Sequence, residues 1–445
     1  MRKVVFALLL LVVAVTSASG QLSQARTQCT NKEKASLDLQ ISACTKIIQS
    51  GRETALNRAV AYYNRGKAYH DKGAYETAIT DYTKALELNP KDADGYNNRG
   101  ASYLANGHYG GAIADYTKVI ELKPRLASAY YNRGLAHKTK AQDGRAFRVT
   151  EPDRGLVYYW RQAEYDHAIA DFSTAIALDP KSPLAYAMRG DAYLNNKDFD
   201  RAIADFNKAI EFDPRLAAAY VNRGNAYQGK KDYDRAIIDY DKAIELDPRL
   251  AAAYNNRGNA YRSKGDSDRA ITDYDKAIEL APTYVKAYIN RGEVYRSKKD
   301  YEGAIADYAK AIEFDPKPGV AYALRGLAYS ERGQARNDLS DQDRAIADYT
   351  KALQINPKFA VAYNNRAWAL FKAGKAEDAL PDAEKSLELD PNSAKALDTR
   401  GSIFEALGRR EEAIADFRRA LSIGANDPLV QASGKEALKR LGAPQ

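Results

Sequence analysis

The chain of 445 residues contains few side chains suited to metal binding or nucleophilic catalysis. Its four histidines are His70, His108, His137 and His167, and no two of them form a His-x3-His pair, which would place two imidazoles on one helix face. The sequence has no P-loop, no GxGxxG motif after a strand and no GxSxG elbow. We therefore expect no catalytic residue, no metal site and no cofactor, and we predict that the protein is not an enzyme.

The two cysteines, Cys29 and Cys44, follow closely after an N-terminal targeting segment. Residues 1–20 combine a basic start, an apolar run and a stretch of small residues, which is typical of a cleaved export signal. An uncleaved anchor stays open, although the run is shorter than the ~20 residues of a membrane-spanning helix. We expect a periplasmic or secreted protein with no membrane span after cleavage. Two cysteines in an oxidising compartment pair most simply with each other, so we expect a Cys29–Cys44 disulfide.

An arginine and an aspartate recur along most of the chain, usually 34 residues apart. The arginines are Arg65, Arg99, Arg133, Arg189, Arg223, Arg257, Arg291, Arg325, Arg366 and Arg400. The aspartates are Asp81, Asp115, Asp171, Asp205, Asp239, Asp273, Asp307, Asp348, Asp382 and Asp416. Two longer steps indicate insertions at about 141–162 and 333–341. A residue needed for one chemical event has no reason to recur in this way, so we interpret both series as ion pairs or hydrogen bonds between helices.

Two helical patterns separated by a turn lie within each interval. Apolar residues fall at helical spacing before each recurring proline, as with Ala236, Tyr240 and Ala243 before Pro248. The proline ends the second helix. A glycine such as Gly265 stands where the first helix needs a left-handed residue to end. The recurring residues are therefore predicted to lie on pairs of helices.

The period and the pattern of residue sizes resemble the tetratricopeptide repeat family. Counting from Ala217 as position 1, the matching residues are Tyr220 at position 4, Gly224 at 8, Tyr227 at 11, Ala236 at 20, Tyr240 at 24, Ala243 at 27 and Pro248 at 32. The resemblance implies an all-α fold, a right-handed α-solenoid of about ten helix-turn-helix repeats with an N-terminal half-repeat cap and a C-terminal capping helix. We expect a signal peptide at 1–20, the cap at 21–58, repeats at 59–92, 93–126, 127–182, 183–216, 217–250, 251–284, 285–318, 319–359, 360–393 and 394–427, and the capping helix at 428–445.

Asparagine is frequent at position 6 of the repeats. It stands there as Asn64, Asn98, Asn132, Asn222, Asn256, Asn290 and Asn365. The resemblance implies that the first helix of each repeat lines the inner surface of the solenoid and that position 6 faces inward. An asparagine side chain can pair with one peptide group, so these residues are candidates for holding an extended peptide. The alternative is that asparagine only tolerates a solvated position.

The first insertion is a second candidate contact site. It carries arginines and aromatic residues, which are enriched at interface hot spots. The candidates are Arg145, Arg148, Tyr158, Tyr159 and Trp160. The alternative is that the flanking helices lengthen and the aromatic side chains pack on each other.

The net charge of +8 is distributed over segments of mixed sign, which indicates a solvated surface and not a nucleic-acid footprint. We predict a scaffold or adaptor that binds a protein or peptide partner in the cell envelope. The alternative function is a carbohydrate or cell-wall-binding module that uses a tyrosine-rich inner face. Neither the partner nor the oligomeric state follows from the sequence.

Overall fold

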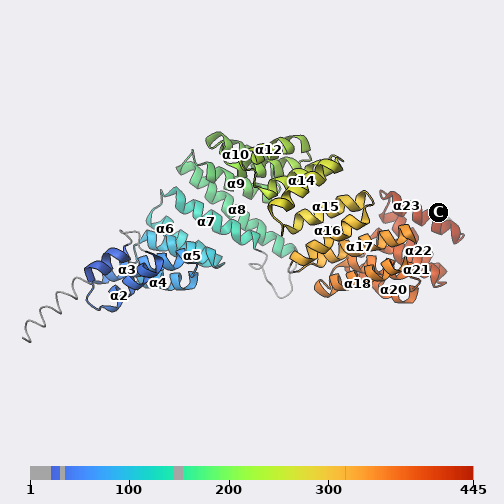
Figure 1. Ribbon diagram of the computed structural model, residues 1–445, viewed down its shortest axis with the longest axis horizontal. Coiled ribbons are helices and arrows are strands. Elements are labelled where there is room, and N and C mark those ends of the chain that lie inside the picture. Colours follow the sequence, from blue (N-terminus) through green and yellow to red (C-terminus); the bar gives the residue numbers. More distant parts are fainter. Residues whose placement is uncertain (1–21, 31–35, 144–153, 316, 444–445) are drawn as a thin grey trace, which may run out of the picture. The chain divides into compact units, whose positions relative to one another are not determined.

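The structure is a computed structural model in which residues 22–30, 36–143, 154–315 and 317–443 are described. Helices joined by short turns make up these ranges, and no strand occurs within them, so the predicted all-α fold is confirmed. The chain divides into an N-terminal half, residues 1–232, and a C-terminal half, residues 233–445. Each half is a stack of helix pairs in which consecutive helices pack on each other (Figure 1).

The N-terminal half begins with a helical segment at residues 22–29 and continues as α2 to α11. The bounds are α2 (Leu37–Gln49), α3 (Ala55–Asp71), α4 (Tyr75–Leu88), α5 (Ala93–Ala105), α6 (Tyr109–Leu122), α7 (Ala127–Gln142), α8 (Arg154–Leu178), α9 (Pro183–Asn195), α10 (Phe199–Phe212) and α11 (Ala217–Gly229). The first helices of its repeats are therefore α3, α5, α7, α9 and α11.

The C-terminal half contains α12 to α23. The bounds are α12 (Tyr233–Leu246), α13 (Ala251–Ser263), α14 (Ser267–Leu280), α15 (Val285–Ser297), α16 (Tyr301–Phe314), α17 (Gly319–Arg336), α18 (Leu339–Ile355), α19 (Ala360–Lys372), α20 (Ala376–Leu389), α21 (Ala394–Ala406), α22 (Arg410–Ile423) and α23 (Pro428–Arg440). Its first helices are α13, α15, α17, α19 and α21, and α23 packs on α21 and α22.

Small residues let the two helices of a repeat approach closely around one buried aromatic ring. A Cβ atom added to Gly258 of α13 would lie 2.8 Å from Cε1 of Tyr274 on α14, closer than any real contact. Tyr274, Ala270 and Ala277 are fully buried. The core thus repeats along the stack, with glycine at position 8 making room for the ring at position 24.

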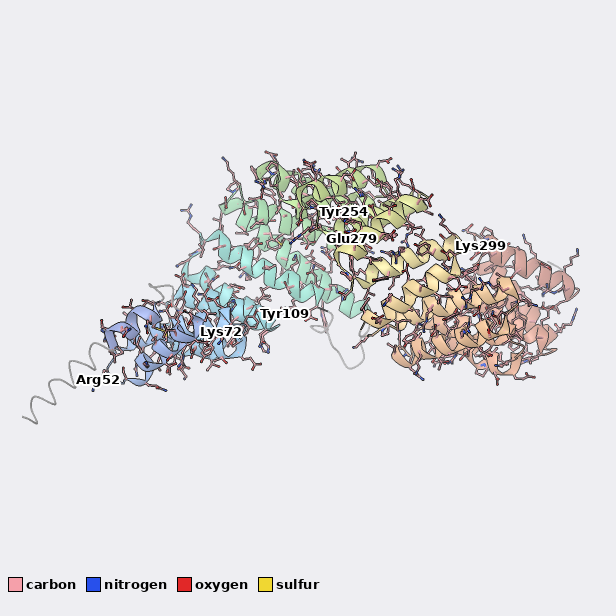
Figure 2. All side chains as sticks on the ribbon, viewed as in Figure 1. Arg52, Lys72, Tyr109, Tyr254, Glu279 and Lys299 are labelled. Atoms are coloured by element: carbon pink, nitrogen blue, oxygen red, sulfur yellow. A yellow bond between two sulfur atoms is a disulfide. The ribbon has the colours of Figure 1, made fainter. Side chains whose placement is uncertain are left out.

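The turns within repeats use the left-handed conformation that the sequence predicts for glycine. Five glycines have positive φ there: Gly73, Gly107, Gly265, Gly374 and Gly408. Lys197, Lys231 and Lys299 adopt the same conformation without being glycine, with φ between 60° and 63°. Lys299, at the turn between α15 and α16, is labelled in Figure 2. These three turns carry a side chain where glycine is less strained.

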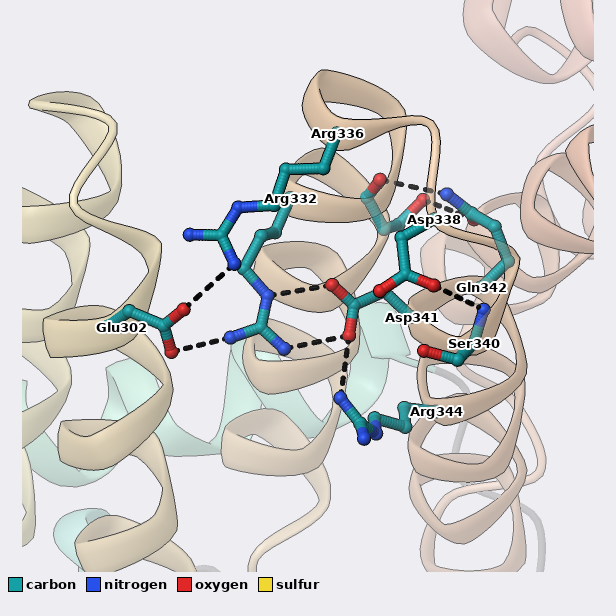
Figure 3. A network of polar contacts seen from close by, with 9 residues as sticks. Glu302, Arg332, Arg336, Asp338, Ser340, Asp341, Gln342 and Arg344 are labelled. Carbon is teal, nitrogen blue, oxygen red and sulfur yellow. Dashed lines mark hydrogen bonds and ion pairs between the residues drawn. The ribbon is translucent and has the colours of Figure 1, made fainter.

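Both insertions lengthen helices. The first extends α7 and α8, and the second extends α17 and α18. A buried ion pair joins the extended parts of α17 and α18: Arg332 donates from Nε and Nη2 to both carboxylate oxygens of Asp341, each at 2.7 Å. Figure 3 shows that Arg344 also donates to Asp341 and that Glu302 of α16 accepts from Arg332. The pair therefore also ties this repeat to the preceding one.

The two ends of the chain are covered in different ways. At the N-terminal end, the Sγ atoms of Cys29 and Cys44 are at bonding distance, 2.11 Å, as predicted. They lie in a buried cluster with Ala25 and Ile47. At the C-terminal end, α23 buries side chains such as Leu438 against the last repeat. Within the described ranges, we find no helix with the length and apolarity to cross a membrane.

Candidate functional site

The recurring arginine and aspartate form ion pairs between the two helices of a repeat. Nine pairs have the same geometry, in which Nε and Nη2 donate to the two carboxylate oxygens at 2.6–2.9 Å. The pairs are Arg65–Asp81, Arg99–Asp115, Arg133–Asp171, Arg189–Asp205, Arg257–Asp273, Arg291–Asp307, Arg325–Asp348, Arg366–Asp382 and Arg400–Asp416.

Most of these arginines also reach the preceding repeat. Nη1 of Arg99 donates to the Thr83 hydroxyl at 3.1 Å, and Nη1 of Arg257 donates to the Asp241 carboxylate at 2.5 Å. A tyrosine at position 4 commonly lies against the guanidinium, as Tyr254 does at 5.5 Å from Arg257. The arginine is thus a structural clamp that links three helices, as the sequence analysis expected.

The first helices of successive repeats also contact one another within each half, as α3 does with α5 and α19 with α21. Consecutive second helices make no comparable contact among the described residues. The side on which helices approach most closely is the inner side of a curved stack. We call this surface, formed by consecutive first helices within one half, the first-helix face.

The position-6 asparagines belong to this face, and three of them are engaged in bonds between repeats. Each donates from Nδ2 to the position-5 residue of the preceding repeat: Asn98 to Tyr63 at 2.7 Å, Asn132 to Asn97 at 2.9 Å and Asn290 to Asn255 at 2.9 Å. These three side chains therefore have a packing role that sequence reasoning missed.

The other asparagines differ in what precedes them. Position 5 before Asn222 is Ala187, and position 5 before Asn365 is Ala323, and neither offers a side-chain acceptor. Asn64, in the first repeat, and Asn256 are, like the others, partly exposed. The signal that separates Asn222 and Asn365 from the three bonded asparagines was present in the sequence as the residue at position 5 of the preceding repeat.

A pocket of about 410 Å³ lies on the first-helix face of the C-terminal half. It is built mainly by α19 and α21, the first helices of the last two repeats, and by the capping helix α23, and Phe417 of α22 completes its wall. Its wall residues are Trp368, Phe371, Lys372, Asp398, Ser402, Glu405, Ala406, Phe417, Ser433, Glu436, Ala437 and Arg440. The sequence did not point to these residues, because those of α19 and α21 stand at positions that vary from repeat to repeat and those of α23 lie outside the repeats, whereas Phe417 has the core position 24.

The pocket combines an aromatic wall with charged groups of both signs. Nζ of Lys372 lies 4.4 Å from the centre of the Trp368 ring. Arg440 of α23 pairs with Glu405 of α21 through two hydrogen bonds of 3.1 and 2.9 Å. Such a surface can bind an extended peptide by stacking and by hydrogen bonding together.

A partly buried carboxyl, that of Asp398, lies in the pocket wall. The hydroxyl of Ser433 donates to Oδ1 of Asp398 at 2.5 Å. Burial raises the pKa of Asp398, and the hydrogen bond from Ser433 partly offsets that shift. Asp398 occupies position 5, where other repeats carry the asparagines that accept from the next repeat. Here the acceptor bonds with the capping helix.

The residues proposed for the first insertion are only partly described. Arg145 and Arg148 lie outside the described residues, and so do the side chains of Tyr158 and Tyr159. Trp160, on α8, is 41% exposed. The backbone from Arg154 onward continues α8, in agreement with the alternative that the helices lengthen.

Three groups able to bind a metal ion converge elsewhere in the same repeat. His137 of α7 and Glu164 and His167 of α8 bring one ligand atom each to within 4.8 Å of one another. A search for two histidines on one helix face does not find these three residues. His137 lies on α7, whereas Glu164 and His167 lie on α8, and the insertion separates the two helices in the sequence.

Models of a repeat family match most of the chain. A model described as TPR repeat matches residues 66–107, 102–140 and 333–374. Models described as tetratricopeptide repeat match residues 157–217, 217–250, 251–284, 285–318, 360–393 and 394–427. Together these ranges cover more than half of the chain. No curated protein matches it.

Several solved structures are similar at low sequence identity. A tetratricopeptide repeat protein from Parabacteroides merdae is 20% identical, and the match covers 61% of this chain and 98% of that one with a TM-score of 0.48. A chain of the APC/C hetero-tetramer Cut9-Hcn1 is 15% identical, with 94% and 96% covered and a TM-score of 0.47. YrrB, a TPR protein with an unusual peptide-binding site, is 26% identical, with 43% and 95% covered and a TM-score of 0.36.

Proposed function

Because the chain belongs to the tetratricopeptide repeat family, we propose that it is a protein–protein interaction scaffold that binds an extended segment of a partner protein on the first-helix face. The observation that carries this proposal is the pocket formed by α19, α21 and α23. Trp368 and Phe371 supply an apolar surface for a partner side chain, and Asp398 supplies an acceptor for peptide N–H groups.

We place the protein outside the cytoplasm, in the periplasm or beyond. Two observations support this placement: residues 1–20 have the composition of an export signal, and Cys29 and Cys44 lie at bonding distance. The finer role, as a scaffold in the cell envelope, belongs to the same proposal.

The structure does not favour carbohydrate binding by tyrosines. The tyrosines at position 24, such as Tyr274 and Tyr308, are fully buried. Those at position 4, such as Tyr254, lie against the guanidinium of the clamp arginine. Because these side chains are used in packing, few of the tyrosine rings at these two positions are free to stack on a sugar.

The test is selection of binders from a displayed library of random peptides, followed by calorimetry. Trp368→Ala should weaken the selected peptides by at least about 2 kcal/mol, roughly thirtyfold in Kd, because a tryptophan in a pocket is a typical hot spot. Trp160→Ala is the matched control, since it removes the other tryptophan of the chain, and should leave Kd unchanged. If Trp160→Ala loses binding and Trp368→Ala does not, the peptide binds at the first insertion and not in the pocket.

The asparagines of the face are tested in the same way. Asn222→Ala should weaken peptides that bind the N-terminal half by about 0.5–1.5 kcal/mol, without loss of helix content, because alanine has the higher helix propensity. Asn98→Ala should instead reduce stability, because it removes the bond to Tyr63. If Asn222→Ala binds every selected peptide as the parent does, the position-6 asparagines are a solvated row.

A further inference from the structure

The repeat with the first insertion contains a cluster of two imidazoles and a carboxylate. His137 lies on α7, and Glu164 and His167 lie three residues apart on one face of α8. Nδ1 of His137 is 2.6 Å from Oε2 of Glu164, and the centres of the two imidazole rings are 5.0 Å apart. Two of the chain's four histidines, His137 and His167, therefore lie close to the Glu164 carboxylate.

The corresponding positions of other repeats have a different composition. Positions 11, 16 and 19 hold Tyr261, Asp266 and Arg269 in the repeat 251–284. There the guanidinium pairs with the aspartate at 2.5 Å and lies 4.5 Å from the centre of the tyrosine ring. The repeat 183–216 repeats this arrangement with Tyr193, Asp198 and Arg201.

The repeat 127–182 replaces both the ring and the guanidinium by imidazoles. His137 stands at position 11 and His167 at position 19, with Glu164 at position 16. In the repeats 183–216 and 251–284, position 19 supplies the cation that pairs with the carboxylate. Here that position supplies a nitrogen with a lone pair when the imidazole is neutral. The substitution thus places two imidazoles beside the carboxylate, whose charge is balanced by Lys140 of α7.

We propose that His137, Glu164 and His167 bind one divalent transition-metal ion of the zinc class, tying α7 to α8. Two imidazoles and one carboxylate suit Zn²⁺, Cu²⁺ or Ni²⁺, whereas Ca²⁺ and Mg²⁺ require mostly oxygen ligands. The ligand atoms of a tetrahedral zinc site lie about 3–3.5 Å apart, given metal–ligand bonds of about 2.0–2.2 Å. The observed spread of up to 4.8 Å requires only side-chain rotation on two fixed helices.

The surrounding residues hold the Glu164 carboxylate in place and leave the His167 side of the site open to solvent. Nζ of Lys140 donates to Oε1 of Glu164 at 2.5 Å, which fixes the carboxylate and leaves Oε2 toward the imidazoles. His167 is exposed, which leaves room for water or a partner's side chain as a further ligand.

The test uses the full exported chain without a polyhistidine tag. Co²⁺ is titrated and followed by its visible absorption, and Zn²⁺ affinity is measured by competition. We expect one ion per chain and a rise in Tm with Zn²⁺. His167→Ala and His137→Tyr should each weaken Zn²⁺ binding roughly tenfold or more. His137→Tyr restores the residue that most other repeats carry at position 11, so it is compatible with the fold.

His108→Ala is the matched control, because it removes an exposed histidine outside the cluster. Binding equal to that of the parent is expected for this variant. The proposal is overturned if His137→Tyr and His167→Ala bind Zn²⁺ as His108→Ala does, or if the parent shows no cobalt absorption at one equivalent. Either result would leave His137 and Glu164 as a hydrogen-bonded pair only.

Discussion

Removal of one clamp arginine should destabilise its repeat far more than removal of a surface charge. Arg257 donates to Asp273 at 2.9 and 2.6 Å and to Asp241 at 2.5 Å. The Asp273 side chain is only 5% exposed, and burial raises its pKa despite the bonds from Arg257. Arg257→Ala leaves this carboxylate buried without its partner, which costs about 3–5 kcal/mol.

The assay is native-state hydrogen exchange, because stability in a repeat array is local and a single free energy of unfolding is not defined. A cost of this size corresponds to amide exchange about 150- to 4,000-fold faster in α13 and α14. Asp241→Ala is the control, because it removes only the half-exposed acceptor on the preceding repeat and should cost less than about 1 kcal/mol.

The double variant Arg257→Ala, Asp273→Ala separates the two sources of that cost. It removes the buried charge together with its partner, so exchange in α14 should be slower than in Arg257→Ala alone. If Arg257→Ala accelerates exchange no more than Asp241→Ala, the clamp does not hold the helix pair and the reasoning is refuted.

Three further predictions follow from the same structure. The denatured exported protein should show no reactive thiol, and replacing Cys29 and Cys44 by serine should cost about 3 kcal/mol by loop entropy; two reactive thiols in the parent would contradict this. Amides in the repeat 360–393 should exchange faster than those in its neighbours, because Ala383 stands where the other repeats have a core aromatic ring; uniform exchange would count against it. Hydrogen bonds from Arg332 lower the pKa of Asp341, so its contribution is complete above the ordinary value near 3.8 and is lost as pH falls below it. Asp341→Asn should therefore cost more stability near about pH 6 than near about pH 2, and equal costs would refute this.

The periodic part of the fold could be predicted from the sequence, because a feature repeated many times reveals its structural role. Gly258 and Tyr274 recur with the repeat and occupy the core as expected. Arg257 and Asp273 recur likewise and form the expected clamp. Each repeat places these residues in the same local geometry, so one rule covers them all.

The candidate sites depend on residues that do not recur. Trp368, Asp398 and Ser433 line one pocket only because α19, α21 and the capping helix α23 pack together, and no spacing within one helix shows this. His137 and Glu164 are 27 residues apart on two helices, with an insertion between them. The bond from Asn98 to Tyr63 likewise depends on how one repeat packs on the next. Contacts between helices decide these sites, and local sequence pattern does not encode them.

The claim that a partner binds on the first-helix face is tested most directly by photo-crosslinking. A selected peptide carrying a photoreactive group is bound to the full chain and irradiated, and the crosslinked residues are identified by mass spectrometry. For peptides weakened by Trp368→Ala, we expect crosslinks in α19, α21 and α23. Crosslinks confined to α20 and to residues of α22 other than Phe417 would contradict the account, because these lie outside the pocket wall.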